Sequence, residues 1–331
     1  MPSWSARRTP VAGSGRTVEA LITTYQKSLA FTELRPKTQQ SYRAQFRLLV
    51  RKWGAHQVRD FTKPAMRTWY ETLFRGKSEH TAIAQLRAMS ILMSHAEMIG
   101  WRPEGSNPCL RLRMKTPNPR DRSATWAEVD ALLAAADDAG LASIGTAIML
   151  SLLQGQRETD LIQATCGEFG ERITRTDGRR RLQVQWTFRR SKRGNAGAMW
   201  LHDEVAPRVR ALIQGAPADR RLLQDERTGA DYHEDLFIRR WREVRDAAIQ
   251  ADKAKALKAL AGLQFRDLRR TFGILSRSGG STKDDTADVL GNSAATNPHL
   301  AETYMPSQLD TASRAVDAIR RPRQPTERKR V

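Results

Sequence analysis

Apolar residues recur at helical spacing through the first hundred positions of the chain. Four stretches share this pattern, with apolar side chains three or four positions apart, and they span about 17–30, 38–53, 62–74 and 79–99. Such spacing places the apolar side chains on one face of a helix. The pattern therefore predicts a four-helix domain over 16–106, preceded by a flexible basic arm over 1–15.

The pattern changes twice in the middle of the chain. Residues 107–123 are rich in Pro and Arg and show no helical period, which predicts a linker between two domains. Thr125 and Glu128 then stand three positions apart before an apolar run, the spacing of a helix capping box. A nearly continuous apolar stretch over 141–154 predicts a helix at the centre of the second core.

Strand spacing follows in residues 171–201. Two stretches flank Asp177 and Gly178, a strong signal for a two-residue hairpin turn, and a second turn at 191–197 leads to a third short strand. Helical spacing resumes in five stretches, about 203–214, 233–250, 266–278, 283–290 and 307–319. We therefore expect a mainly α fold with a small antiparallel β-hairpin sheet, its second domain spanning 124–320 and a basic disordered tail spanning 321–331.

The charge of the chain is unevenly distributed. Its 331 residues include 56 Lys and Arg against 36 Asp and Glu, a net charge of +20. Residues 1–120 carry +14, residues 121–320 only +2 and the tail +4. A positive potential of this size is typical of a nucleic-acid-binding domain, the alternative being a solvated basic surface that serves solubility. The side chains we expect to contact DNA are Arg43, Arg47, Arg87, Arg111, Arg113 and Lys115.

Several classes of protein are excluded by what the sequence lacks. Two cysteines are too few for a disulfide framework or a thiolate metal cluster. No stretch approaches the roughly 18 apolar residues of a membrane span, and the charged N-terminus lacks the apolar core of a signal peptide. No P-loop occurs, and Asp284 and Asp285 have no third acidic partner at two-metal spacing. We expect a cytoplasmic, nucleoid-associated protein without membrane contact, cofactor or metal.

Four ordered segments carry candidate chemistry. The first, Gln154–Leu161, contains Arg157 and Asp160, and the second places Lys192 in the turn between two predicted strands. The third, Phe265–Phe272, contains Arg266 and Arg269, and the fourth joins Leu290-Gly291-Asn292-Ser293 to Thr303-Tyr304. Taken singly, each has an ordinary explanation: a surface ion pair, a solvated hairpin lysine or a tyrosine that packs its ring.

Together and in this order, the segments resemble the tyrosine recombinases, the phage-integrase family, over about residues 17–320. The front domain is similar to the SAM-like core-binding domain of that family, and the second to its catalytic domain. The resemblance implies that Arg157 and Arg269 hold the scissile phosphate, that Asp160 supports them, and that Lys192 protonates the leaving 5′ oxygen. Tyr304 would form a 3′-phosphotyrosyl bond, which conserves the energy of the phosphodiester and requires neither ATP nor a metal.

Two positions depart from the family pattern. Arg266 stands where the family usually has histidine, and Asn292 stands where it has histidine or tryptophan. Both side chains can donate to a phosphate oxygen, although an arginine cannot accept the phenol proton. His299 is a further candidate for one missing histidine, and Tyr304 follows Asn292 by more residues than the family pattern suggests. We therefore expect an active but slow recombinase of a prophage or mobile element.

The resemblance also implies partners and leaves alternatives open. It implies double-stranded DNA, a homotetramer on that DNA and accessory DNA-bending proteins. The predicted helix 307–319 either packs on its own domain or supports the tetramer. One alternative is a relative that has lost cleavage and acts as an architectural DNA-binding protein. Another is a helix-turn-helix regulator, which would leave the four segments of the second domain unexplained.

Overall fold

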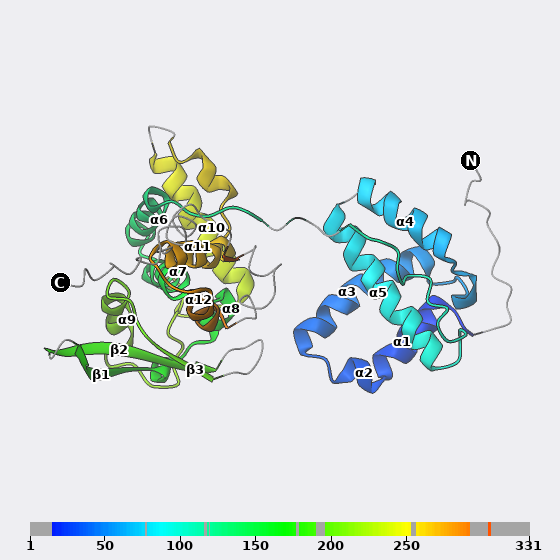
Figure 1. Cartoon of the computed structure of the whole chain (residues 1–331), viewed down its shortest axis with the longest axis horizontal. Coiled ribbons are helices and arrows are strands. Elements are labelled where there is room, and N and C mark those ends of the chain that lie inside the picture. The colour runs from blue at the N-terminus through cyan, green and yellow to red at the C-terminus, as the bar shows by residue number, and fades with distance from the viewer. Residues whose placement is uncertain are drawn as a thin grey trace, which may run out of the picture. The chain divides into compact units, whose positions relative to one another are not determined.

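The chain folds into two units, residues Met1–Asn118 and Pro119–Val331 (Figure 1). A computed structural model describes residues 15–76, 78–115, 118, 120–176, 179–189, 196–252, 256–291 and 304–305. Within this part of the chain, no helix is both long and apolar enough to cross a bilayer.

The first unit is a helical bundle around its own core. Its α-helices are α1 (Val18–Lys27), α2 (Leu29–Thr32), α3 (Pro36–Trp53), α4 (Lys63–Gly76) and α5 (Glu79–Met98). Thr17 and Ser78 cap α1 and α5 with their hydroxyl oxygens, which accept from backbone N–H groups three residues on. The four predicted helices are present, and the short α2 is an addition to them.

The first predicted helix, about 17–30, ends earlier than expected, at Lys27, because Ser28 leaves the helical conformation. Ser28 adopts an extended conformation (φ −77°, ψ 153°), and its hydroxyl donates to the Tyr25 carbonyl. Hydroxyl groups that bond to nearby backbone in this way compete with the helix. Leu29, which the pattern placed on the apolar face, is therefore 74% exposed, and Phe31 takes its place in the core.

The predicted linker 107–123 is too long, because its first nine residues pack on the first unit. Leu112 is buried in the core of that unit, and the Arg67 guanidinium donates to its carbonyl oxygen (2.7 Å). The backbone N–H of Lys115 donates to the Tyr70 hydroxyl (3.0 Å). Apolar residues that pack from an irregular segment, as here, show no helix or strand period in the sequence.

The second unit is built around a buried central helix. Its α-helices are α6 (Trp126–Asp138), α7 (Ala142–Gln154), α8 (Glu158–Gln163), α9 (Ala206–Ile213), α10 (Glu234–Ala251), α11 (Phe265–Ser278) and α12 (Lys283–Leu290). The structure confirms the capping box of Thr125 and Glu128 and the burial of α7. The predicted helix 307–319 lies outside the described residues, and the short α8 was not predicted.

A three-stranded antiparallel sheet covers one side of this unit (Figure 1). Strands β1 (Phe169–Thr176), β2 (Arg179–Arg189) and β3 (Ala196–Trp200) pair in the order β1-β2-β3, as the hairpin pattern predicted. Phe169 lies opposite Trp186, and both rings face the core. The two turn segments, 177–178 and 190–195, lie outside the described residues.

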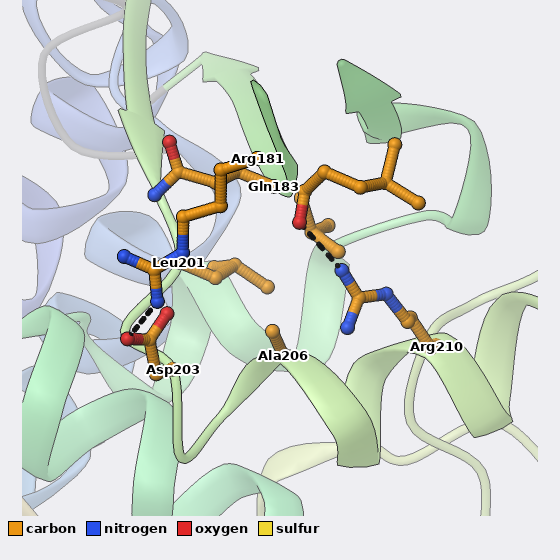
Figure 2. Close-up of a pocket in the computed structure, with 8 residues that line it drawn as sticks. Arg181, Gln183, Leu201, Asp203, Ala206 and Arg210 are labelled. Atoms are coloured by element: carbon orange, nitrogen blue, oxygen red, sulfur yellow. Dashed lines mark hydrogen bonds and ion pairs between the residues drawn. The ribbon is translucent and has the colours of Figure 1, made fainter. Parts of the chain in front are cut away.

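A hollow of about 300 Å³ lies between β2 and α9 (Figure 2). Arg181 forms an ion pair with Asp203 at its rim, and Arg210 is paired with Glu171 at 2.7 Å. Because carboxylates already pair with both cations, the hollow offers an anion no free positive charge. None of the described candidate site residues lines it.

Candidate active site

The first segment of the site begins where α7 ends. Gly155 closes the helix in a left-handed conformation (φ +60°), and a Cβ there would lie 2.6 Å from the Phe272 ring. Only glycine satisfies both demands without strain. The next residue, Gln156, is fully buried and donates to the Gln154 carbonyl (2.6 Å). This turn fixes the position of Arg157.

Arg157 directly precedes a short helix, α8. It is the N-cap residue of α8 and has an extended conformation (φ −80°, ψ 147°). Its Nη1 lies 3.4 Å from Oδ2 of Asp160, whose side chain is 5% exposed. Its Nη2 donates to the Leu290 carbonyl oxygen at 3.3 Å.

Arg269 reaches the same place from α11. The residue is only 4% exposed, and its guanidinium donates to the carbonyl oxygens of both Gly155 and Leu290. Arg157 and Arg269 therefore converge on one oxygen, although 112 positions separate them. This convergence is the arrangement that phosphate binding by two arginines requires.

The two accepting carbonyls lie at the C-terminal ends of helices. Gly155 is the C-cap of α7, and Leu290 is the last residue of α12, before the left-handed Gly291 (φ +55°). The last carbonyls of a helix have no partner within it and carry partial negative charge. They can therefore accept hydrogen bonds from the two guanidinium groups, and Asp160 adds a carboxylate beside Arg157.

Tyr304 packs beside Arg269. Its ring centroid lies 5.8 Å from Cζ of Arg269, within the range of a cation–π contact. The Tyr304 carbonyl lies against Gly273 of α11, where any Cβ would collide with it. The next residue, Met305, is buried against Ala287 of α12. These contacts hold the phenol ring next to the Arg269 guanidinium.

The remaining site predictions divide into two groups. Lys192, Asn292 and His299 lie outside the described residues. Arg266 is exposed on the first turn of α11, three positions before Arg269 and thus its neighbour on the helix surface. The catalytic roles of all these residues stay predictions.

The predicted DNA-binding residues lie on three elements of the first unit. Arg43 and Arg47 are exposed one turn apart on α3, and Arg87 is exposed on α5. The others are Arg111, Arg113 and Lys115, which we call the basic ridge. All three are exposed and alternate with the inward-facing Leu112 and Met114.

Sequence reasoning missed the backbone part of the site. Nothing in a residue's identity marks the Leu290 carbonyl as a shared acceptor, and the role of Gly273 as a seat for Tyr304 was not foreseen. The glycines that end α7 and α12 were the available signal, since a left-handed C-cap marks where helix carbonyls become accessible. Among the described residues, no three His, Cys, Asp or Glu side chains could jointly hold a metal ion.

Comparison with known proteins shows which known structures have a similar fold. No family model and no curated protein matches the sequence. Among solved structures, a lambda integrase dimer bound to a COC' core site is similar at 16% identity and a TM-score of 0.66, over 88% of this chain and 77% of that chain. A lambda integrase tetramer bound to a Holliday junction has 17% identity and a TM-score of 0.67, over 88% and 78%.

A transposon integrase gives the same result. The Tn1549 integrase in complex with circular intermediate DNA is similar at 14% identity and a TM-score of 0.68, over 91% of this chain and 99% of that chain. At such identities the likeness concerns the fold. The chain has the tyrosine recombinase fold, and the predicted fold class is confirmed.

Proposed function

We propose that this protein is a site-specific DNA recombinase that cuts and rejoins DNA through a 3′-phosphotyrosyl intermediate. The observation that carries the proposal is the convergence of Arg157 and Arg269 on the Leu290 carbonyl, with the Tyr304 ring over Arg269. A scissile phosphate placed against these guanidinium groups would meet the phenol without a large rearrangement. The fold shared with DNA-bound integrases supports the same conclusion.

The chemistry follows from where charge develops. The phenol oxygen of Tyr304 attacks phosphorus, and a P–O bond to tyrosine forms as the bond to the 5′ oxygen breaks. Negative charge grows on the nonbridging oxygens, where Arg157 and Arg269 stabilise it. Lys192 gives its proton to the departing 5′ oxygen, and the phenol proton passes to water or another acceptor. Attack by a different 5′ hydroxyl reverses the step and completes strand exchange.

Three further side chains have supporting roles in this proposal. Asp160 orients Arg157 through their ion pair. Asn292 and Arg266 donate to phosphate oxygens at positions where the family has other donors. Because an arginine side chain offers donors and no acceptor, Arg266 cannot serve as the base for the phenol, and we expect slow turnover for this reason.

The first unit supplies DNA affinity in this proposal. The basic ridge and the arginines of α3 and α5 present their charges to solvent, as phosphate contacts require. By analogy with the lambda integrase tetramer on a Holliday junction, the protein would act as a homotetramer on duplex DNA, at the nucleoid. Accessory DNA-bending proteins would assist that assembly.

A covalent trapping experiment tests the proposal. A duplex is first selected from a randomised library with the Tyr304→Phe variant, which binds DNA but cannot cleave it. The wild type is then incubated with that duplex, nicked so that the released 5′ fragment diffuses away. We expect a protein–DNA adduct that survives denaturation and is absent with Tyr304→Phe.

The same experiment separates the alternative function. If the wild type binds the selected duplex at nanomolar concentrations but forms no adduct at any nick position, the protein is an architectural DNA-binding relative. An adduct that persists in Tyr304→Phe would assign the nucleophile to another residue.

A further inference from the structure

The chain enters the second unit along α11, the helix that carries Arg269. We call residues 120–124 the lead-in segment. The guanidinium of Arg120 contacts Asp267 through two bonds, Nε to Oδ1 at 3.1 Å and Nη2 to Oδ2 at 2.9 Å. Its Nη2 also donates to the Gly262 carbonyl (2.9 Å). The Asp267 side chain is 4% exposed and that of Arg120 is 39% exposed.

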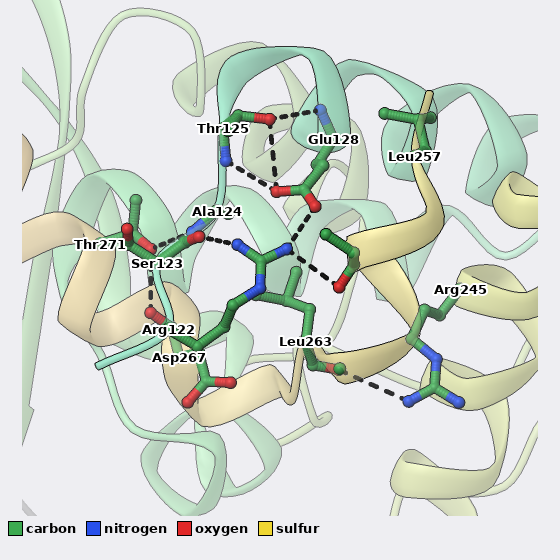
Figure 3. Close-up of polar contacts among 12 residues, drawn as sticks. Arg122, Ser123, Ala124, Thr125, Glu128, Arg245, Leu257, Leu263, Asp267 and Thr271 are labelled. Carbon is green, nitrogen blue, oxygen red and sulfur yellow. Dashed lines mark hydrogen bonds and ion pairs between the residues drawn. The ribbon is translucent and has the colours of Figure 1, made fainter. Parts of the chain in front are cut away.

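A second contact ties the lead-in segment to α11 one turn later (Figure 3). The backbone N–H of Ala124 donates to the hydroxyl oxygen of Thr271 (2.9 Å), and that hydroxyl donates to the Asp267 carbonyl (2.9 Å). Asp267 and Thr271 are four positions apart and thus lie on one face of the helix. The lead-in segment therefore grips α11 at two successive turns of the same face.

Arg269 lies on the opposite face of the helix from this grip. With 3.6 residues per turn, positions two before and two after Arg269 each lie about 160° around the axis from it. Arg269 meets the carbonyls of Gly155 and Leu290 on its own face. The helix is thus held between the lead-in segment and the phosphate-binding cluster, and a rotation or shift of α11 would displace the guanidinium.

The Asp267 carboxylate also organises the start of the helix. Its Oδ2 accepts from the Gln264 backbone N–H (2.9 Å), which completes a capping box at the N-terminus of α11. One buried carboxylate therefore joins the lead-in segment to the first turn of the helix. The hydrogen bond to Asp267 raises the pKa of the Arg120 guanidinium above its usual value.

We infer that Arg120 is a positioning residue for Arg269: its grip on Asp267 sets the rotation and height of α11 that the arginine needs to hold the scissile phosphate. The inference rests on the proposed function, because it assigns the grip to the cleavage step. Misplacement of a reacting group by about 1 Å can cost about a hundredfold in rate. Loss of Arg120 also leaves the buried Asp267 carboxylate without its cation, which lowers stability, so the test needs a control variant with a similar cost in stability.

Arg122 provides a matched control from the same segment. Its guanidinium pairs with the buried Glu128 of α6 and donates to the Ala259 carbonyl (3.3 Å), so its contacts go to elements other than α11 (Figure 3). The Arg122 side chain is 23% exposed, less than that of Arg120. Arg122→Gln should therefore lower the melting temperature at least as much as Arg120→Gln does.

The test compares adduct formation, DNA affinity and melting temperature in Arg120→Gln, Arg120→Lys and Arg122→Gln. At saturating DNA, we expect Arg120→Gln to slow adduct formation by about tenfold or more with little change in affinity. Arg120→Lys, which keeps the charge but not the two-bond geometry, should be intermediate. Arg122→Gln should stay within about twofold of the wild type. Equal rates in Arg120→Gln and the wild type, or equal slowing in both glutamine variants, would overturn the inference.

A DNA-free measurement separates failure of this inference from failure of the proposed function. If the wild type forms no adduct, the proposed function fails, and amide hydrogen exchange over 265–272 decides whether the grip exists. Faster exchange there in Arg120→Gln, but not in Arg122→Gln, supports the grip, and unchanged exchange contradicts it. Should Arg120→Gln fail to fold, Arg120→Lys serves in both measurements.

Discussion

Two glycines decide where the phenol and the first guanidinium lie. Gly155 lets the chain leave α7 in a left-handed turn that brings Arg157 to Leu290. Gly273 leaves room on α11 for the backbone of Tyr304. In both cases the missing Cβ is the functional feature, since any side chain would meet a ring or a carbonyl. The positions of the reactive groups thus depend on residues that carry no chemistry themselves.

The role of Gly273 leads to a prediction about cleavage. Gly273→Ala places a methyl group against the Tyr304 carbonyl and should push residues 304–305 off α11. We expect adduct formation on the nicked duplex to slow by about tenfold, because the phenol loses its fixed position. Gly76→Ala is the control, since a methyl there meets open space and lies in the first unit. A normal rate in Gly273→Ala would mean that Tyr304 acts from a different position.

At the scale of elements, strongly periodic helices could be predicted and non-periodic segments could not. The spacing of apolar residues placed α3, α4, α5, α7, α10, α11 and α12 to within a few residues. It failed at Ser28, whose hydroxyl donates to a helix carbonyl, and at residues 107–115, where Cys109 and Leu112 of the supposed linker are buried in the first core. It also missed α8, because six residues are too few to show a helical period.

The sequence motifs name side chains of the candidate site but not the backbone carbonyls that accept from them. Arg157, Arg269 and Tyr304 were named from ordered motifs; both arginines donate to the Leu290 carbonyl, and the Tyr304 ring lies against Arg269, while their catalytic roles stay predictions. Their shared acceptor depends on tertiary placement of two helix ends, which no local pattern encodes. The grip of Arg120 on Asp267 joins positions 147 apart and was likewise beyond local reasoning.

The basic ridge is an element with a strained backbone and a testable purpose. Arg111 and Arg113 have positive φ values of 55° and 49°, unusual for residues other than glycine. Burial of Leu112 and the bond from Arg67 hold the chain in this shape. Strain of this kind persists where the surrounding structure fixes it, often at binding sites. Here it directs two guanidinium groups toward solvent.

We therefore predict that Arg113→Gln weakens DNA binding through one lost phosphate contact. The slope of log affinity against log salt concentration should fall by about one. Arg59→Gln, which changes an arginine whose side chain is 78% exposed and outside the ridge, is the control and should leave the slope unchanged. Equal slopes for wild type and Arg113→Gln, measured by fluorescence anisotropy, would remove the ridge from the DNA interface.

At the scale of the whole molecule, the two units differ in how their charges are used. The front of the chain carries a large positive excess, whereas residues 121–320 are nearly balanced. In the second unit, Asp225 is fully buried and pairs with Arg240 through two bonds of 2.8 and 2.9 Å. The hydrogen bonds from Arg240, and then from Thr228, lower the pKa of Asp225 below its usual range.

This pair predicts how stability depends on acidity. Because the pKa of Asp225 is lower in the folded state, its stabilising effect is complete above about pH 4, the unfolded pKa, and is lost as pH falls through the folded pKa. Asp225→Asn should destabilise the protein by about 3 kcal/mol at pH 7 and flatten the acid dependence. Asp246→Asn changes a carboxylate that is 55% exposed, on α10 with Arg240, and should change stability by less than about 1 kcal/mol. Urea denaturation at pH 3 to 7 measures both, and parallel pH profiles for wild type and Asp225→Asn would contradict the prediction.

The oxygen that accepts from both arginines is the backbone carbonyl of Leu290, so an amino-acid substitution cannot remove it. Substituting alanine for Leu290 would remove the leucine side chain and leave the carbonyl oxygen in place, so an alanine scan would not test the acceptor. Because Leu290 is buried, related proteins could carry another apolar residue there and keep the same acceptor, provided that the glycine after it still turns the chain. Replacing the peptide bond between Leu290 and Gly291 with an ester would weaken that carbonyl as an acceptor and leave every side chain intact. Backbone chemistry, more than conventional mutagenesis, is the tool that would reveal how this centre is held together.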